Sequence, residues 1–199
     1  MPQTIIDLIE CFKKFSGIGE KTAERMALQT LELDQDIIDL FVQSLLSSKT
    51  NIKTCKVCHN LTEQDICSIC SNENRTNDVI CVVEEPKNVF QFEKMGIFPG
   101  KYHVLGGLIS PLNGVNPEDI NIQSLVEKVE EEKVKEVIIA VKPSIEGETT
   151  SLYISKVLKD KNVTISKLAH GIPLGADMDY IDPLTLELAL DERKDITSS

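Results

Sequence analysis

Apolar residues recur at helical spacing in the N-terminal part of the chain. They form one stripe within residues 1–15 and a second after position 36, made up of Ile5, Leu8, Ile9, Phe12 and Phe15, then Ile37, Ile38, Phe41, Val42, Leu45 and Leu46. A repeat of about 3.6 residues places such side chains on one face of an α-helix. A further helix is predicted to begin near Glu20, so residues 1–54 are expected to be helical.

The pattern changes after position 78, where short apolar runs alternate with amphipathic stretches. Unbroken runs at 79–83 and 137–141 suit strands that are buried on both faces, and a shorter strand is predicted at 163–165. Helices are predicted through Val89, Phe90 and Phe92, over 124–135, and from a start near Thr149 and Thr150. This alternation predicts an α/β fold, a mostly parallel sheet with helices on both faces.

Four cysteines stand between these two parts of the chain. Cys55 and Cys58 form one Cys-x-x-Cys pair, and Cys67 and Cys70 form another. Two intervening residues let both sulfurs of a pair face one ion, and two pairs complete the tetrahedral shell that zinc prefers. Because the protein fills all four ligand positions, the predicted zinc site is structural rather than catalytic.

The alternative interpretations of the four cysteines are a pair of disulfides or a redox dithiol. The N-terminus lacks the basic region and cleavage site of a signal peptide, and no apolar run reaches the length of a membrane helix. A cytoplasmic protein without a membrane segment is therefore expected, and its other cysteines, Cys11 and Cys81, are expected to be reduced core thiols. His59, which follows a ligand, is predicted to face solvent.

The net charge limits how this chain could contact nucleic acid. Over 199 residues, 21 Lys and Arg oppose 32 Asp and Glu, for a net charge of -11. Residues 171–199 hold 7 acidic and 2 basic residues, nearly half of the excess. This balance argues against a nonspecific basic coat, so any DNA contact must be local.

A local basic element follows the first helix. In Gly17-Ile18-Gly19, two glycines permit a tight turn, and Lys21 and Arg25 lie one helical turn apart just beyond it. Backbone amides at a helix start can hold a phosphate, so the stretch resembles the helix-hairpin-helix motif of sequence-independent DNA-binding proteins. The alternative is a helix that ends in glycine, followed by solvated Lys and Arg.

Carboxylates follow the two apolar strands. Glu84 comes after the run 79–83, and Glu146 and Glu148 come after 137–141. Groups at the carboxyl ends of parallel strands line the functional crevice, where these three could hold magnesium. Solvated loop acids are the alternative, and neither Tyr153 nor Tyr180 has a recognisable base that would make it a nucleophile.

Six motifs in order resemble the RecR family of bacterial recombination mediators. They are Gly17-Ile18-Gly19, the four-cysteine knuckle, Cys81-Val82-Val83-Glu84, Tyr102-His103-Val104-Leu105-Gly106-Gly107 with Ser110-Pro111, Glu146-Gly147-Glu148, and Gly171-Ile172-Pro173-Leu174-Gly175. The resemblance implies a helix-hairpin-helix region (1–54), a four-cysteine zinc finger (55–78), a Toprim domain (79–170) and a C-terminal helical segment that contacts another subunit (171–199).

The resemblance also implies a function. Family members are not known as enzymes; they form ring-like homotetramers that can encircle DNA, and they work with RecO and RecF to load RecA at gaps. By motif position, Gly17, Gly19, Lys21 and Arg25 become the DNA-binding candidates. The rival hypotheses are a magnesium-dependent Toprim nuclease or nucleotidyl transferase using the three glutamates, and an adaptor whose acidic face binds partner proteins.

Two positions depart from the family pattern. Phe15-Ser16 stands where family members usually have Leu-Pro, which keeps the apolar plug but loses the rigidity of proline. Glu146-Gly147-Glu148 stands where catalytic Toprim enzymes usually carry Asp-x-Asp. The longer glutamates could change the metal geometry or serve protein partners.

Overall fold

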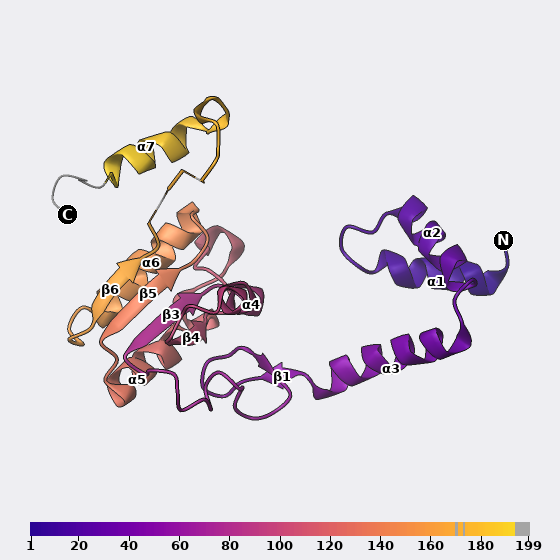
Figure 1. The fold of residues 1–199 in the computed structure, drawn as a ribbon, viewed down its shortest axis with the longest axis horizontal. Coiled ribbons are helices and arrows are strands. Elements are labelled where there is room, and N and C mark those ends of the chain that lie inside the picture. The colour runs from indigo at the N-terminus through magenta and orange to yellow at the C-terminus, as the bar shows by residue number, and fades with distance from the viewer. Residues whose placement is uncertain (170, 173, 194–199) are drawn as a thin grey trace. The chain divides into compact units, whose positions relative to one another are not determined.

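The computed structural model describes residues 1–169, 171–172 and 174–193 (Figure 1). The chain divides into two compact units, Met1–Ile52 and Lys53–Ser199. Residues 194–199, the end of the predicted subunit-contact segment, lie outside the described residues, as does Pro173 of the last sequence motif. Among the described helices, none has both the length and the apolar character needed to cross a membrane.

In the first unit, helices α1 (Gln3–Lys13) and α2 (Glu20–Thr30) pack on each other. Their core consists of Ile5, Ile9, Phe12, Ala23 and Ala27. The two alanines are fully buried, and their small side chains let the helices approach closely. The first predicted apolar stripe is thus confirmed as a packing face, except that Phe15 follows the helix and is exposed.

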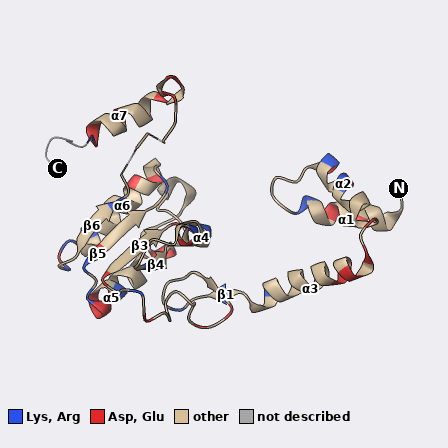
Figure 2. Cartoon of the chain, in the orientation of Figure 1, with Lys and Arg blue, Asp and Glu red and all other residues tan. Residues whose placement is uncertain are grey.

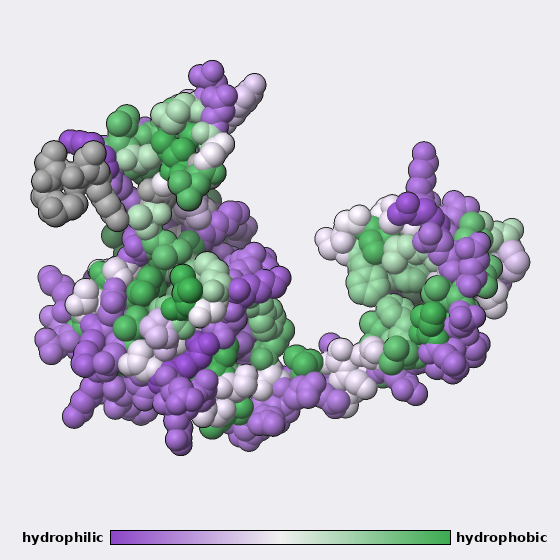
Figure 3. All heavy atoms as spheres, in the orientation of Figure 1, coloured by the Kyte–Doolittle hydropathy of each residue, from purple (hydrophilic) through white to green (hydrophobic). Residues whose placement is uncertain are grey.

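Helix α3 (Gln35–Asn51) has an apolar face that its own unit does not bury. The helix itself is confirmed, but its large apolar side chains are 46–65% exposed at Ile37, Leu40, Phe41, Val42, Leu45 and Leu46. Several of them border an open cavity of about 820 Å³ together with residues of α1 and α2. Apolar atoms are accordingly visible on the surface of this unit (Figure 3). Cys11 lines the same cavity and is exposed, so the prediction of a core thiol there is wrong.

The second unit begins with a small antiparallel ribbon that encloses the first cysteine pair. Strands β1 (Lys53–Thr54) and β2 (Leu61–Thr62) pair with Lys53 opposite Thr62. Cys55 and Cys58 lie in the loop between the two strands, and Cys67 and Cys70 lie in the segment that follows. The ribbon therefore closes the loop that carries Cys55 and Cys58.

A four-stranded parallel sheet forms the body of this unit. Its strands are β3 (Val79–Val83), β4 (Lys101–Val104), β5 (Glu136–Ala140) and β6 (Thr164–Lys167), in the spatial order β4-β3-β5-β6. Every neighbouring pair is parallel, with Cys81 of β3 between Tyr102 and Ile138. The apolar runs at 79–83 and 137–141 are thus confirmed as the two central strands.

Helices cover both faces of this sheet, as predicted. Helices α5 (Ile122–Glu132) and α6 (Ile145–Leu158) pack on the face that carries Ile80 and Val82. Helix α4 (Pro86–Met95) places Val89 on the opposite face, beside Cys81 and Val83. Alternate β3 side chains therefore enter two separate cores, which is why the strand is apolar without interruption.

Helix α6 starts earlier than the sequence pattern predicts. It begins at Ile145, with Ser144 as its N-cap, rather than near Thr149 and Thr150. The Ser144 hydroxyl accepts a first-turn N–H at 3.2 Å, and the two threonine hydroxyls donate to carbonyl oxygens one turn back along the helix. The acidic residues after β5 consequently lie in the first turn of a helix instead of a loop.

The chain continues beyond β6 into helix α7 (Pro183–Asp191), which has no buried residue. Asp182 caps this helix by accepting the Thr185 N–H at 2.9 Å. Three short 3₁₀ helices complete the described structure, at Pro111–Asn113 (η1), Pro117–Asp119 (η2) and Met178–Tyr180 (η3). The predicted helical character of the C-terminal segment is thus confirmed.

Candidate metal centre and nucleic-acid interface

The sulfur atoms of Cys55, Cys58, Cys67 and Cys70 converge. All four Sγ atoms lie within 4.8 Å of one another, and those of Cys58 and Cys67 are 3.5 Å apart. Four bonds of about 2.3 Å to a tetrahedral ion would separate sulfurs by about 3.8 Å, whereas a disulfide requires about 2.05 Å. The cysteines are free thiols, so their arrangement fits a metal site and not two disulfides.

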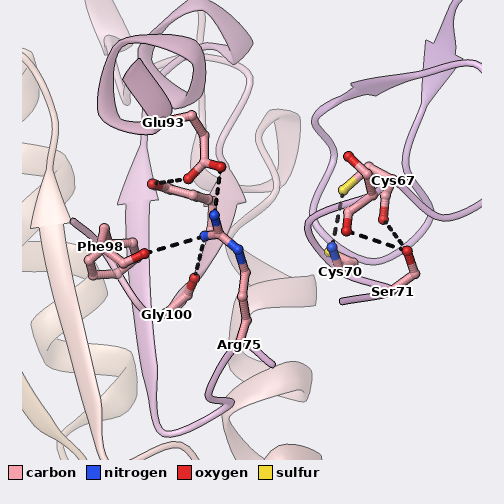
Figure 4. Close-up of polar contacts among 9 residues, drawn as sticks. Cys67, Cys70, Ser71, Arg75, Glu93, Phe98 and Gly100 are labelled. Carbon is pink, nitrogen blue, oxygen red and sulfur yellow. Dashed lines mark hydrogen bonds and ion pairs between the residues drawn. The ribbon is translucent and has the colours of Figure 1, made fainter. Parts of the chain in front are cut away.

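Backbone amides of the knuckle point at its sulfurs. The Cys67 N–H donates to Cys55 Sγ at 3.3 Å, and the Cys70 N–H donates to Cys67 Sγ at 3.4 Å. Ser71 closes the second Cys-x-x-Cys pair: its hydroxyl donates to the Cys67 carbonyl oxygen at 3.1 Å (Figure 4). Its backbone N–H donates to the same oxygen at 3.0 Å. These donors stabilise thiolate charge and orient the ligands, as outer-shell hydrogen bonds do in metal sites.

The four crowded cysteines could be thiolates together only with a cation between them. The hydrogen bond to Cys67 raises the pKa of Cys58, and the same hydrogen bond lowers the pKa of Cys67. Four thiolates at this spacing would repel one another, and a divalent ion with an affinity for sulfur removes the repulsion. The donor set fits Zn²⁺, which would be held by the four cysteines with no open position. Bound there, Zn²⁺ would join two chain segments and supply no reactive site.

The four-cysteine segment, residues 55–70 and here called the knuckle, packs on the edge of the parallel sheet. The Val104 N–H at the end of β4 donates to the Cys58 carbonyl oxygen at 2.8 Å, which satisfies a donor of an edge strand. The prediction that His59 faces solvent is wrong: its Nε2 lies 2.9 Å from Ser124 Oγ, and its ring meets His103 edge-on at 5.2 Å. A left-handed backbone at His59 (φ 61°) turns the ring towards α5.

The Gly-Ile-Gly turn has the geometry that the sequence predicts. Gly17 has φ +83°, a left-handed conformation that favours glycine, and Gly19 is the extended N-cap of α2. Ile18 is half-buried against the core of α1 and α2 and fills the turn. Lys21 and Arg25 are exposed on α2, one turn apart. Figure 2 marks the Lys and Arg positions of the chain in blue. Lys13 pairs with Glu10 at 2.8 Å and with Glu20 at 2.6 Å.

The three glutamates lie at the predicted edge of the sheet but do not form a compact metal site. Glu84 follows β3, and Glu146 and Glu148 stand in the first turn of α6, after the neighbouring β5. Among the described residues, only the cysteines place three or more ligand atoms within 4.8 Å. Glu148 pairs with Lys167 at 3.1 Å. The pKa of Glu146 is lowered by hydrogen bonds from the Glu146 backbone N–H and from the Ser144 side chain. Magnesium binding there stays a prediction.

Comparisons with known proteins assign the chain to a family. Family models match in series: RecR helix-hairpin-helix at 5–48, RecR four-cysteine zinc finger at 52–72, Toprim domain at 78–169 and RecR C-terminal at 171–194. The recombination protein RecR of Enterococcus faecalis is 44% identical over 195 residues, which are 98% of each chain. The chain belongs to the RecR family. The family resemblance, the fold class and the structural zinc predicted from sequence are therefore confirmed.

Sequence reasoning missed a polar anchor in this RecR-family chain between the zinc finger and the Toprim domain. Arg75 donates to Glu93 at 2.6 Å and to the Gly100 carbonyl oxygen at 2.9 Å (Figure 4). Tyr102 donates to the other oxygen of Glu93 at 2.7 Å. The ion pair is largely shielded, with side chains 19% and 29% exposed. The partners of Arg75 lie 18 and 25 positions further along the chain, so no local sequence pattern predicts these contacts.

His103 is a second residue whose setting the sequence does not reveal. It is fully buried at the end of β4, and its Nε2–H donates to the Asn121 carbonyl oxygen at 2.7 Å. Nδ1 is buried without a hydrogen-bond partner among the described residues. Burial lowers the pKa of His103 to about 3, so the ring is neutral in the folded protein.

This buried imidazole predicts a pH dependence of stability. Below about pH 6.5, His103 becomes protonated in the unfolded chain but stays neutral in the folded chain. The stability that depends on neutral His103 is therefore fully present above pH 6.5 and is lost as the pH falls towards 3. Between about pH 7.5 and 5.5, the unfolding free energy of the wild type should fall by about 1.3 kcal/mol more than that of His103→Gln. Urea unfolding of both zinc-loaded proteins at the two pH values measures this difference. Equal losses would contradict it.

Proposed function

We propose that this chain is a DNA-binding recombination mediator that acts in recombinational DNA repair. The observation that carries the proposal is the 44% identity, over 98% of each chain, to a protein named for recombination. In line with the family resemblance, we infer a cytoplasmic clamp on single-stranded, double-stranded or gapped DNA that helps RecO and RecF load RecA. The clamp acts by binding and not by catalysis.

The turn between α1 and α2 is the proposed DNA contact. Gly19 is the N-cap of α2, and an α-helix leaves its first four N–H groups without intrahelical partners, so these amides are available to a phosphate. Lys21 and Arg25 are exposed, and among the described residues neither makes an ion pair that would compete with a phosphate. Lys13 is already neutralised by two glutamates, which makes it a weaker candidate. The contact is local and compatible with the acidic net charge.

Removing the positive charges of Lys21 and Arg25 should lower the affinity for DNA and should also make that affinity less sensitive to salt. For Lys21→Ala with Arg25→Ala we expect about tenfold weaker binding at about 0.1 M salt, and a slope of log K against log salt that is flatter by about 1 to 2. Fluorescence anisotropy with a labelled duplex over a salt series measures both quantities. The matched control is Lys133→Ala with Lys159→Ala, two exposed lysines of the Toprim domain. An unchanged salt slope in the hairpin variant would remove this surface from the interface.

The open apolar face of α3 supports the proposed homotetramer. Monomeric proteins rarely expose contiguous apolar patches of more than a few hundred Å², and α3 buries none of its residues within its own chain. We infer that the N-terminal unit of a second copy covers this face and closes the 820 Å³ cavity beside it. A ring built from such contacts would leave the hairpins free for DNA.

A charge on this face should lower the oligomeric state. We expect Leu45→Asp to elute as a smaller species than the wild type at micromolar concentration, because an unpaired carboxylate is costly to bury in an apolar interface. Size-exclusion chromatography with light scattering gives the mass. Gln43→Asp adds the same charge to the same helix at a polar position and should leave the mass unchanged. A wild-type mass for Leu45→Asp would contradict the proposed contact.

The Toprim acids are proposed to contact partner proteins. Glu146 is held ionised and Glu148 is exposed, which suits recognition by a basic surface. The alternative, a magnesium-dependent nuclease or nucleotidyl transferase, is favoured by one observation: Glu84 and Glu146 follow neighbouring parallel strands of a Toprim domain. Such an enzyme would lose metal-dependent cleavage in Glu84→Gln.

One experiment separates the two functions. The protein is incubated with labelled gapped DNA and magnesium, and the products are run on native and denaturing gels. A substrate that is shifted but uncut supports the clamp. Strands that are cut by the wild type but stay intact with Glu84→Gln support the enzyme, and a substrate that is neither shifted nor cut overturns both.

A further inference from the structure

Lys128 is a buried cation that the fold does not pair. Its side chain lies on the inner face of α5 with Leu125 and Val129, and the residue is only 6% exposed. Its Nζ is buried and has no hydrogen-bond partner in the described part of the chain. Burial of an unpaired ammonium is strongly unfavourable, so this position calls for a source of negative charge.

The metal centre is one source of negative charge near Lys128. Lys128 lies one helical turn after Ser124 on α5, and Ser124 Oγ is 2.9 Å from Nε2 of His59, the residue that follows the ligand Cys58. Histidines cannot supply negative charge, whereas a Zn²⁺ ion with four thiolate ligands keeps a net negative charge. Cys58 belongs to that ligand set.

We propose that Lys128 is the counter-ion of the zinc–thiolate centre and joins zinc occupancy to the docking of the zinc finger on helix α5. Zinc turns the cysteines into a compact anion, and this anion offsets the burial of the ammonium. The ammonium in turn stabilises the thiolate ligands against protonation and zinc loss. Docking is completed by the bond from the Val104 N–H to the Cys58 carbonyl oxygen and by the contact of His59 with Ser124.

A competing partner for Lys128 lies on its own helix. Glu132 is four positions along α5, a spacing at which Lys and Glu can pair, and its Oε2 is also buried without a hydrogen bond among the described residues. Within the described part of the chain, Lys128 and Glu132 do not pair with each other. If a rotation of both side chains joined them, Lys128 would serve the Toprim domain alone and would be indifferent to zinc. Glu132→Gln separates the two roles.

The test measures zinc affinity in the full-length, zinc-loaded protein. Zinc is partitioned at fixed pH between the protein and a metallochromic chelator for the wild type, Lys128→Met, Lys128→Arg and Glu132→Gln, with Lys156→Met as an exposed-lysine control. We expect Lys128→Met to bind zinc about tenfold more weakly or worse, as losses of outer-shell partners do. Lys128→Arg, Glu132→Gln and Lys156→Met should remain within about twofold of the wild type.

Other outcomes would overturn the assignment. Wild-type zinc affinity in Lys128→Met means that the ammonium does not support the metal centre. If Glu132→Gln lowers the zinc affinity as much as Lys128→Met does, Lys128 and Glu132 affect zinc only by stabilising the Toprim domain as a pair. Circular dichroism verifies that each variant is folded before partition, and should Lys128→Met fail to fold, Lys128→Gln is measured in its place.

Discussion

Cys58→Ser is expected to lose stoichiometric zinc and to unfold the knuckle. A serine hydroxyl is a poor zinc ligand, and three remaining thiolates leave an incomplete shell. Because structural zinc contributes about 10–16 kcal/mol of apparent binding free energy in small zinc fingers, its loss removes most of the stability of a segment with so little core of its own. Metal analysis should fall from about one zinc per chain to near zero.

The effect should reach the Toprim domain. The Cys58 carbonyl oxygen accepts the Val104 N–H, and Ile69 packs against both the cysteine cluster and the core beneath α4. When the knuckle unfolds, β4 becomes an open edge and part of that core is exposed. We therefore expect a lower melting temperature by calorimetry and rapid proteolysis within 53–72.

Cys11→Ser is the matched control for this substitution. It makes the same chemical change at an exposed thiol of the first unit, outside the sulfur cluster. Its zinc content and melting temperature should equal those of the wild type. Full zinc content and an unchanged melting temperature in Cys58→Ser would refute the structural role of the metal.

Sequence predicted best those features that depend on residues close together in the chain. The spacing of the two Cys-x-x-Cys pairs predicts that their sulfurs converge on one ion, and the four sulfurs lie within 4.8 Å of one another. The central strands could be located because burial on both faces demands uninterrupted apolar residues, as in Val79–Val83. The turn at Gly17 was predictable because few residues other than glycine adopt its left-handed conformation readily.

The misplaced features depend on contacts between distant parts of the chain. His59 faces α5 because of Ser124 and His103, which are far from it in sequence. The start of α6 was misplaced because Ser144 and Thr149 are both plausible caps, and the choice follows from how the chain leaves β5. One signal for Lys128 was available: it lies three residues from Leu125, on a helix face that is otherwise apolar.

Gly147→Ala is expected to destabilise the second unit strongly, although alanine normally favours a helix. In the exposed interior of a helix this change gains up to about 1 kcal/mol. At Gly147 a Cβ would lie 1.9 Å from the Lys142 carbonyl oxygen and 3.1 Å from its carbon. Backbone atoms cannot rotate away as a side chain can, so the chain between β5 and α6 must move. We expect a loss of about 3 kcal/mol, or roughly 10 °C in melting temperature.

Gly171→Ala provides the comparison, since its Cβ would meet no atom of the described residues within 4 Å and its backbone is not left-handed. That variant should stay within about 0.5 kcal/mol of the wild type. Because Gly147 stands between Glu146 and Glu148, the same shift would displace both carboxylates in the first turn of α6. Gly147→Ala should therefore alter whatever those acids bind, while zinc content, set by the cysteines, stays at about one per chain. A melting temperature at or above that of the wild type would show that the turn can relax and that glycine is not required there.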